Sequence, residues 1–321
     1  NVGDHYFGLH HKYNFHDLDV AVVGDEAGES SEIFDHFWNS DQVFPASAFV
    51  EEPSWEAIEF ARREKLDELR NAKELAEFPL EQRDWSDELS AFVEGMSPGT
   101  STVEYDRLLA DTAAPTQDGV VKLAEIVAQA QREVLILNAY IIPGEQMMEI
   151  LREATKRGVR VRMLTNSRAS NDVPAVTAKY KKYRLPLLEA GVELYEFRAH
   201  PEIQDGIVDT HPVEAHFAGL HTKAAVIDRE TVYVGSLNLD PRSIQLNTEM
   251  GMIVSSTGLA EEVAAIAERD MGPSNSWRVN LDEDGELYWE STEGIVEKQP
   301  AQKSWLRMQR WFFGIAPEDQ L

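Results

Sequence analysis

Residues 221–238 read HTKAAVIDRETVYVGSLN. Two short apolar runs stand on either side of a charged turn, which predicts a β-hairpin. Because side chains alternate along a strand, His221 and Lys223 are predicted to share one face of the first strand. The return strand is then expected to bring Ser236 and Asn238 beside them. This hairpin is the centre from which we interpret the rest of the chain.

The polar residues of the hairpin form a set that suits a phosphate. Lys223 and Asn238 are candidates to bind its nonbridging oxygens, and the imidazole of His221 is a candidate to attack phosphorus. Asp228 lies at the far end of the strand, seven residues from the histidine, where we interpret it as a structural or orienting carboxylate. Glu249 is a candidate to hydrogen-bond the imidazole and so to select its tautomer.

Strands and helices alternate around the hairpin, and this alternation predicts an α/β fold with a parallel or mixed sheet flanked by helices. Helices are expected at 120–131, 145–157, 173–190 and 259–269, and strands at 134–142, 159–165, 192–197, 224–227, 231–234 and 250–254. In the first hundred residues the patterns predict a strand at 17–23 and helices at 30–39 and 54–76. Residues 97–117 are rich in Ser, Thr, Pro and Gly, which is typical of a connector.

Composition narrows the possible functions. The 321 residues include 57 acidic and 30 basic side chains, for a net charge of -27. This balance counts against a general binder of polyanions, which needs lysines and arginines over a broad face. The absence of cysteine excludes disulfides, thiolate nucleophiles and cysteine-ligated metals. No stretch reaches the roughly 18 apolar residues of a membrane-spanning helix.

The spacing H-x-K-x4-D-x6-G-S-x-N resembles the signature of the phospholipase D superfamily. The resemblance extends beyond the motif, because the flanking segments are similar to those of bacterial cardiolipin synthases. The segments that carry it are Asn238-Leu-Asp-Pro-Arg-Ser, Asn247-Thr-Glu-Met-Gly, and Asn166 with Asn171-Asp-Val-Pro-Ala-Val, Tyr180, Tyr183 and Arg184.

Members of this superfamily carry two such motifs, one in each pseudo-repeated half. The resemblance implies that one histidine forms a phosphohistidine while the other protonates the departing alcohol. The opening Asn1-Val-Gly-Asp4-His-Tyr6-Phe7 is similar to the residues at the end of the first motif and just after it. We therefore expect an incomplete first half whose histidine and lysine lie upstream. A partial match at His10, Lys12, Asp17 and Gly24 lacks the Ser and Asn and is interpreted as a decoy.

On this resemblance we expect three parts. Residues 1–115 are the remainder of the first half with its connector, 116–275 the second half with the motif, and 276–321 a tail with an amphipathic basic helix. The expected catalytic residues are His221, Lys223 and Asp228; Ser236, Asn238 and Asn1 are expected to bind phosphate, and Glu249 to orient the imidazole. No metal or other cofactor is expected.

The activity that the resemblance implies is phosphatidyl transfer between phospholipids, with phosphatidylglycerol as acceptor. The expected partners are anionic phospholipids, the cytoplasmic-side membrane surface of a bacterium, and a possible second copy of the chain; nucleic acid is not expected. A hydrolase releasing phosphatidic acid, a nuclease and a non-catalytic lipid-binding remnant are the alternatives. An upstream signal or lipid anchor stays open.

Two basic segments are further candidates for contact with anionic headgroups. Residues 179–184 hold three lysines and Arg184 interleaved with tyrosines, and the alternative is a solvated helix face. Residues 303–315 carry no acidic residue and form an amphipathic pattern, for which packing against the domain is the alternative.

Overall fold

The computed structural model describes residues 2–10, 12–41, 43–72, 84–107, 116–202 and 217–300. These residues fall into two compact units. The first takes its residues from 1–21 and 97–321, and the second from 22–96. The candidate site lies in the first unit. The three-part division expected from the sequence follows the family pattern and stays a prediction.

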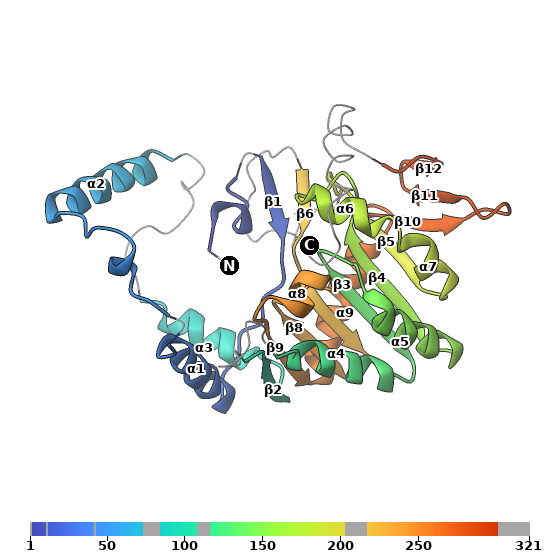
Figure 1. Ribbon diagram of the computed structural model, residues 1–321, viewed down its shortest axis with the longest axis horizontal. Coiled ribbons are helices and arrows are strands. Elements are labelled where there is room, and N and C mark those ends of the chain that lie inside the picture. Colours follow the sequence, from blue (N-terminus) through green and yellow to red (C-terminus); the bar gives the residue numbers. More distant parts are fainter. Residues whose placement is uncertain are drawn as a thin grey trace. The chain divides into compact units, whose positions relative to one another are not determined.

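A sheet of ten strands is the frame of the first unit (Figure 1). Its central strand is β3 (Glu133–Asn138), which pairs in parallel with β4 (Arg160–Asn166) and antiparallel with β7 (Lys223–Ile227). Strand β4 also pairs in parallel with β5 (Glu193–Phe197), and the remaining pairs are antiparallel. In spatial order the strands are β12 (Gly294–Val296), β11 (Leu287–Ser291), β10 (Ser276–Leu281), β5 (Glu193–Phe197), β4 (Arg160–Asn166), β3 (Glu133–Asn138), β7 (Lys223–Ile227), β8 (Thr231–Gly235), β9 (Met250–Ser255) and β2 (Thr100–Tyr105).

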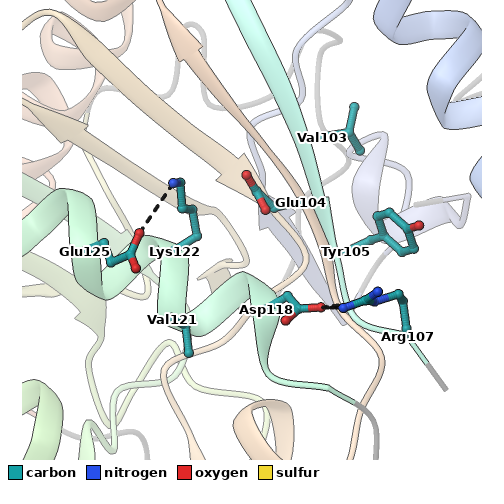
Figure 2. Close-up of a pocket in the computed structure, with 8 residues that line it drawn as sticks. All are labelled: Val103, Glu104, Tyr105, Arg107, Asp118, Val121, Lys122 and Glu125. Carbon is teal, nitrogen blue, oxygen red and sulfur yellow. Dashed lines mark hydrogen bonds and ion pairs between the residues drawn. The ribbon is translucent and has the colours of Figure 1, made fainter. Parts of the chain in front are cut away.

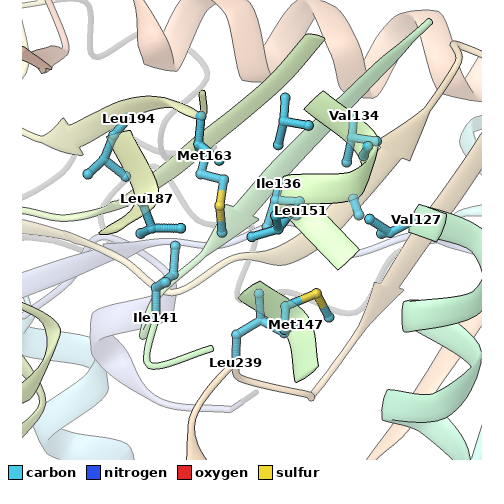
Figure 3. Close-up of a cluster of buried hydrophobic side chains, with 14 of the residues drawn as sticks. Val127, Val134, Ile136, Ile141, Met147, Leu151, Met163, Leu187, Leu194 and Leu239 are labelled. Carbon is cyan, nitrogen blue, oxygen red and sulfur yellow. The ribbon is translucent and has the colours of Figure 1, made fainter. Parts of the chain in front are cut away.

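Helices cover both faces of this sheet, so its central strands are apolar on both sides. In β3, Ile136 packs on one face with α4 (Asp118–Gln129) and α5 (Gly144–Lys156), whereas Leu135 packs on the other with α9 (Thr257–Met271). Figure 3 shows part of the first cluster, where Met147 and Leu151 of α5 lie against the sheet. The helices of the unit are η1 (Asp4–Tyr6), α4 (Asp118–Gln129), α5 (Gly144–Lys156), α6 (Pro174–Tyr180), α7 (Arg184–Glu189), α8 (Pro241–Gln245) and α9 (Thr257–Met271). The expected mixed sheet flanked by helices is therefore confirmed.

A short second sheet joins residues that are far apart in the sequence. Strand β1 (Tyr13–His16) pairs in parallel with β6 (Phe217–Leu220). Leu18 and Val20 come after β1 and pack against the cluster that includes α9.

The second unit is helical. It contains α1 (Asp25–Trp38), η2 (Ala46–Ala48), α2 (Trp55–Asn71) and α3 (Ser86–Glu94). Ser54 begins α2 by accepting a hydrogen bond from the backbone N–H of Ala57, as helix N-caps do.

Three local predictions were wrong. The strand expected at 17–23 lies earlier, at β1. It ends before Asp17, because the carboxylate of Asp17 binds the backbone N–H of Leu18 and the imidazole of His221. The expected connector contains β2, whose Thr, Val and Tyr side chains suit its pairing with β9. The single helix expected at 173–190 is two helices, α6 and α7.

Candidate active site

The expected hairpin is present. Strands β7 and β8 pair antiparallel, with Ala224 opposite Val234. Lys223 is the first residue of β7, and His221 precedes the strand instead of lying within it. Ser236 comes directly after the last residue of β8. The polar residues therefore gather at one end of the hairpin, beside Asn138, which ends β3 and pairs with Lys223.

Gly235 shows why the return strand ends as it does. A Cβ atom at this position would lie 2.6 Å from the Cα of Gly251 on β9, and as close to the backbone oxygen of Met250. Only glycine fits this approach between strands. The tight contact holds β8 against β9, and with it the Ser236 side chain, next to Glu249.

Two buried asparagines hold the loops around the hairpin. Asn138 donates to the backbone oxygen of Leu237 and accepts from the N–H of Leu239, each at 3.1 Å. Asn166, at the end of β4, exchanges hydrogen bonds with the backbone of Leu220 at 2.7 and 2.8 Å. These amides replace ladder hydrogen bonds where the strands end, and they lie on either side of the segment that carries His221.

Asp17 is the hydrogen-bond partner of the His221 imidazole. Its Oδ2 lies 2.8 Å from Nδ1. Because a carboxylate only accepts, Nδ1 carries a proton and Nε2 is left for another partner. Burial by itself would raise the pKa of Asp17, but the hydrogen bond to His221 and the electrostatic interactions with His221 and Lys223 hold that pKa below its usual range. The sequence analysis missed this role.

Aromatic rings enclose the imidazole. Phe15 stacks on it with ring centres 4.9 Å apart, and Tyr6 meets it edge-on at 5.3 Å. The backbone N–H of His221 donates to the carbonyl of His16 at 2.8 Å. The ring is thus held at its face, at its edge and through its backbone.

Lys223 lies next to the imidazole. Its Nζ is 3.0 Å from each ring nitrogen of His221 and also donates to the backbone oxygen of that residue. The side chain is 6% exposed. Burial lowers the pKa of Lys223 to about 8, although the carboxylates of Asp17 and Glu249 oppose this.

Glu249 was predicted to hydrogen-bond the imidazole of His221, but its carboxylate binds other groups. Its carboxylate accepts from the hydroxyl of Ser236 and from the amide of Asn247, the latter at 3.0 Å.

Asn238 lies two residues beyond Ser236. Its amide oxygen is buried and has no hydrogen-bond partner in the part of the chain that the structure describes. A buried polar atom of this kind is a candidate ligand contact.

Asp228 lies at the opposite end of β7 from His221. Its carboxylate accepts from the backbone N–H groups of Gln131, Arg132 and Glu133 at 2.7–2.9 Å. Burial would raise its pKa, but these three hydrogen bonds keep that pKa below its usual value. The geometry favours the structural interpretation, in which Asp228 fastens the start of β3 to the hairpin turn.

Comparison with known proteins bears on this arrangement. Residues 123–271 match the family described as "Cardiolipin synthase, PLD-like domain", a span that includes both strands of the hairpin and Glu249. Cardiolipin synthase C of Escherichia coli (strain K12) is 30% identical over 334 residues, covering 100% of this chain and 69% of that protein. The chain belongs to the phospholipase D superfamily, as a cardiolipin synthase-like member.

One further relative and one solved structure are less similar to this chain. An uncharacterised Helicobacter pylori (strain J99) protein is 27% identical over the whole of this chain and 64% of its own length. The crystal structure of phosphatidylserine synthase from Haemophilus influenzae Rd KW20 is 13% identical with a TM-score of 0.42, over 76% of this chain and 53% of that one. The chain thus spans 69% of the length of Cardiolipin synthase C and 64% of the length of the Helicobacter pylori protein.

The basic cluster at 179–184 is half buried: Lys179 and Arg184 are buried, so they do not form part of an exposed basic face. Arg184 is 3% exposed and its Nε donates to Glu196 at 2.5 Å. Tyr180 donates to the same carboxylate at 3.1 Å. Only Lys181 and Lys182 are exposed. Asn1 and the basic segment 303–315 lie outside the described residues.

A cavity of about 460 Å³ lies elsewhere in the first unit, between β2 and α4 (Figure 2). Its cations are paired within it: Arg107 with Asp118 at 3.1 Å and Lys122 with Glu125 at 3.4 Å. None of the predicted site residues that the structure describes lines this cavity. Among the described residues, no group of His, Asp and Glu is arranged to hold a metal, and no helix has the length and apolar character needed to span a bilayer.

Proposed function

We propose that this chain is a phosphatidyltransferase of the cardiolipin synthase type, acting on phospholipid phosphodiesters at a membrane surface. The observation that carries the proposal is the set of contacts on His221: Asp17 at Nδ1, Lys223 beside the ring, and the signature residues Ser236 and Asn238 at the same end of the hairpin. Membership of the family supports the choice of phospholipid as substrate.

The chemistry needs two imidazoles. The Nε2 of one attacks phosphorus, forming a P–N bond and breaking the P–O bond to the headgroup alcohol, while the other gives a proton to the leaving oxygen. The hydroxyl of the acceptor lipid then loses its proton to the second imidazole and displaces the first. His221 supplies one of the two. The other comes from a second motif or from a second copy of the chain.

The remaining residues have distinct parts in the proposal. The Lys223 ammonium and the Asn238 amide bind the nonbridging oxygens, where negative charge grows in the transition state. Asn1 is proposed as a further phosphate ligand. Ser236 donates to Glu249, and this pair lies at the same end of the hairpin. Asp228 is assigned a structural part.

The proposal is tested with vesicles that contain phosphatidylglycerol and a second phospholipid, in the presence of a chelator. The expected products are a diphosphatidyl lipid and the released alcohol. Formation of phosphatidic acid alone would identify a hydrolase, in which water is the acceptor. Absence of any product, or its loss on adding the chelator, would contradict the proposal. Sedimentation then measures the mass of the active species. A monomer would mean that a second motif supplies the other imidazole, and a dimer that a second copy of the chain does.

A further inference from the structure

Three consecutive residues at the end of β1 and just after it contact His221 in different ways. Phe15 stacks on the ring of His221, the carbonyl of His16 accepts from its backbone N–H, and Asp17 binds its Nδ1. The hydroxyl of Thr222 also donates to the His16 carbonyl, at 3.2 Å. A displacement of β1 would therefore disturb the face, the backbone and the Nδ1 hydrogen bond of His221 together.

Strand β1 is short, so each contact that fixes it to the unit matters. Its ladder is the parallel pairing of four residues with β6. A second fixed point is the side chain of His16, whose Nε2 lies 2.5 Å from Oδ2 of Asp270 in the last turn of α9. Both side chains are buried, at 3% and 0% exposed.

The surroundings of this pair make it rigid. The His16 ring stacks on Phe197 of β5, with centres 5.9 Å apart. The second oxygen of Asp270 accepts from Arg269 at 2.9 Å, and its backbone carbonyl accepts from the hydroxyl of Ser276 at 2.5 Å. A buried pair with several hydrogen bonds has one stable geometry, because any displacement leaves a charge without a partner.

We propose that His16 and Asp270 are positioning residues for His221. They fix β1 to α9, and β1 holds the imidazole through Phe15 and Asp17. The His16–Asp270 pair acts on the ring through the strand and not by touching it. The inference rests on the proposed function only for its kinetic consequence, since the position of the ring is measurable without substrate.

The test compares Asp270→Asn with a matched control, Glu196→Gln. Glu196 is also fully buried and paired with a cation, Arg184, but it lies in β5 and has no contact with β1 among the described interactions. Asp270→Asn is expected to lower kcat about 100-fold, as small misplacements of a reacting group do, with little change in KM. Glu196→Gln is expected to keep the kcat of the wild type.

Substitution of His16 separates positioning from general damage. The amide of Gln reaches about as far as Nε2 of histidine, so His16→Gln is expected to keep the hydrogen bond to Asp270 and most of the activity. His16→Asn places its amide at the position of Nδ1, too short to reach Asp270. It is expected to behave like Asp270→Asn.

The readout that does not depend on activity is the imidazole NMR spectrum of His221, assigned by its loss in His221→Asn. The signals are expected to move in Asp270→Asn and His16→Asn, and to stay in place in His16→Gln and Glu196→Gln. Unmoved signals in folded Asp270→Asn or His16→Asn would overturn the positioning role. Moved signals in these two variants, beside a wild type that forms no lipid product, would support that role and contradict the proposed function.

Discussion

Oδ2 of Asp17 lies 2.8 Å from Nδ1 of His221, although 204 residues separate the two in the chain. This contact selects the imidazole tautomer in which Nε2 carries the lone pair, toward which Lys223 donates at 3.0 Å and which the proposed mechanism directs at phosphorus. It also joins the N-terminal segment of the chain to the motif hairpin.

Replacing Asp17 by Asn tests that relationship. The amide keeps the size of the side chain but lets the imidazole adopt the other tautomer, so kcat is expected to fall by about 100-fold or more, within the range for general acid–base groups. KM for vesicle substrate is expected to change little. Asp19→Asn is the control, because Asp19 is exposed on the same segment. Equal kcat values for the two variants would show that Asp17 does not orient the ring.

The pH dependence of activity depends on Lys223. Burial lowers its pKa to about 8, so the ammonium that we propose to bind the phosphate is lost as pH rises through that value. Activity is expected to fall above pH about 8, through a falling kcat, because the ammonium is proposed to stabilise charge that grows in the transition state. In Lys223→Arg the charge persists, because guanidinium does not lose its proton in this range, and the alkaline fall is expected to disappear. An unchanged alkaline fall in that variant would assign it to another group.

The same lysine is expected to cost stability. Its pKa falls from 10.5 to about 8 on folding, which corresponds to about 3 kcal/mol against the charged form in the folded protein. Because the folded pKa is the lower one, this cost is complete below pH 8 and vanishes as pH rises to about 10.5. Lys223→Met is therefore expected to raise the free energy of unfolding at pH 7 by up to about 3 kcal/mol.

The control for that measurement is Lys122→Met, at an exposed lysine paired with Glu125. Exposed pairs of this kind contribute less than about 1 kcal/mol, so its free energy of unfolding is expected to stay near that of the wild type. A Lys223→Met protein that is less stable than the wild type would mean that the contacts of Nζ outweigh its desolvation.

Asp228 is expected to affect stability instead of chemistry. Its replacement by Ala leaves three backbone N–H groups at the start of β3 without their partner, which costs about 1–3 kcal/mol. The φ of 55° adds strain for alanine. Asp228→Asn keeps an oxygen that can accept from these N–H groups, and Asn tolerates positive φ better than Ala. Its loss of stability is therefore expected to be smaller. The kcat of the folded fraction, measured beside thermal unfolding, should match the wild type in each; a tenfold loss would make Asp228 catalytic.

The hairpin and the alternation of strands and helices were predictable, because their patterns are local. Apolar runs of strand length and the spacing of His221, Lys223 and Ser236 appear within a few residues of each other. The partner of His221 was not predictable in this way. Asp17 reaches the ring only because β1 pairs in parallel with β6, and no local pattern records a pairing over such a distance. The burial of Arg184 was not predictable for the same reason, because its partner Glu196 is placed opposite it by the sheet.

His221 is proposed to carry out the chemistry. The rate of phosphatidyl transfer by His221→Asn in mixed phospholipid vesicles tests this proposal, beside the wild type and His36→Asn, an exposed histidine in α1. Loss of either the nucleophile or the acid is expected to lower the rate by at least about 100-fold, while His36→Asn keeps the rate of the wild type. Transfer by folded His221→Asn at the rate of the wild type would contradict the account.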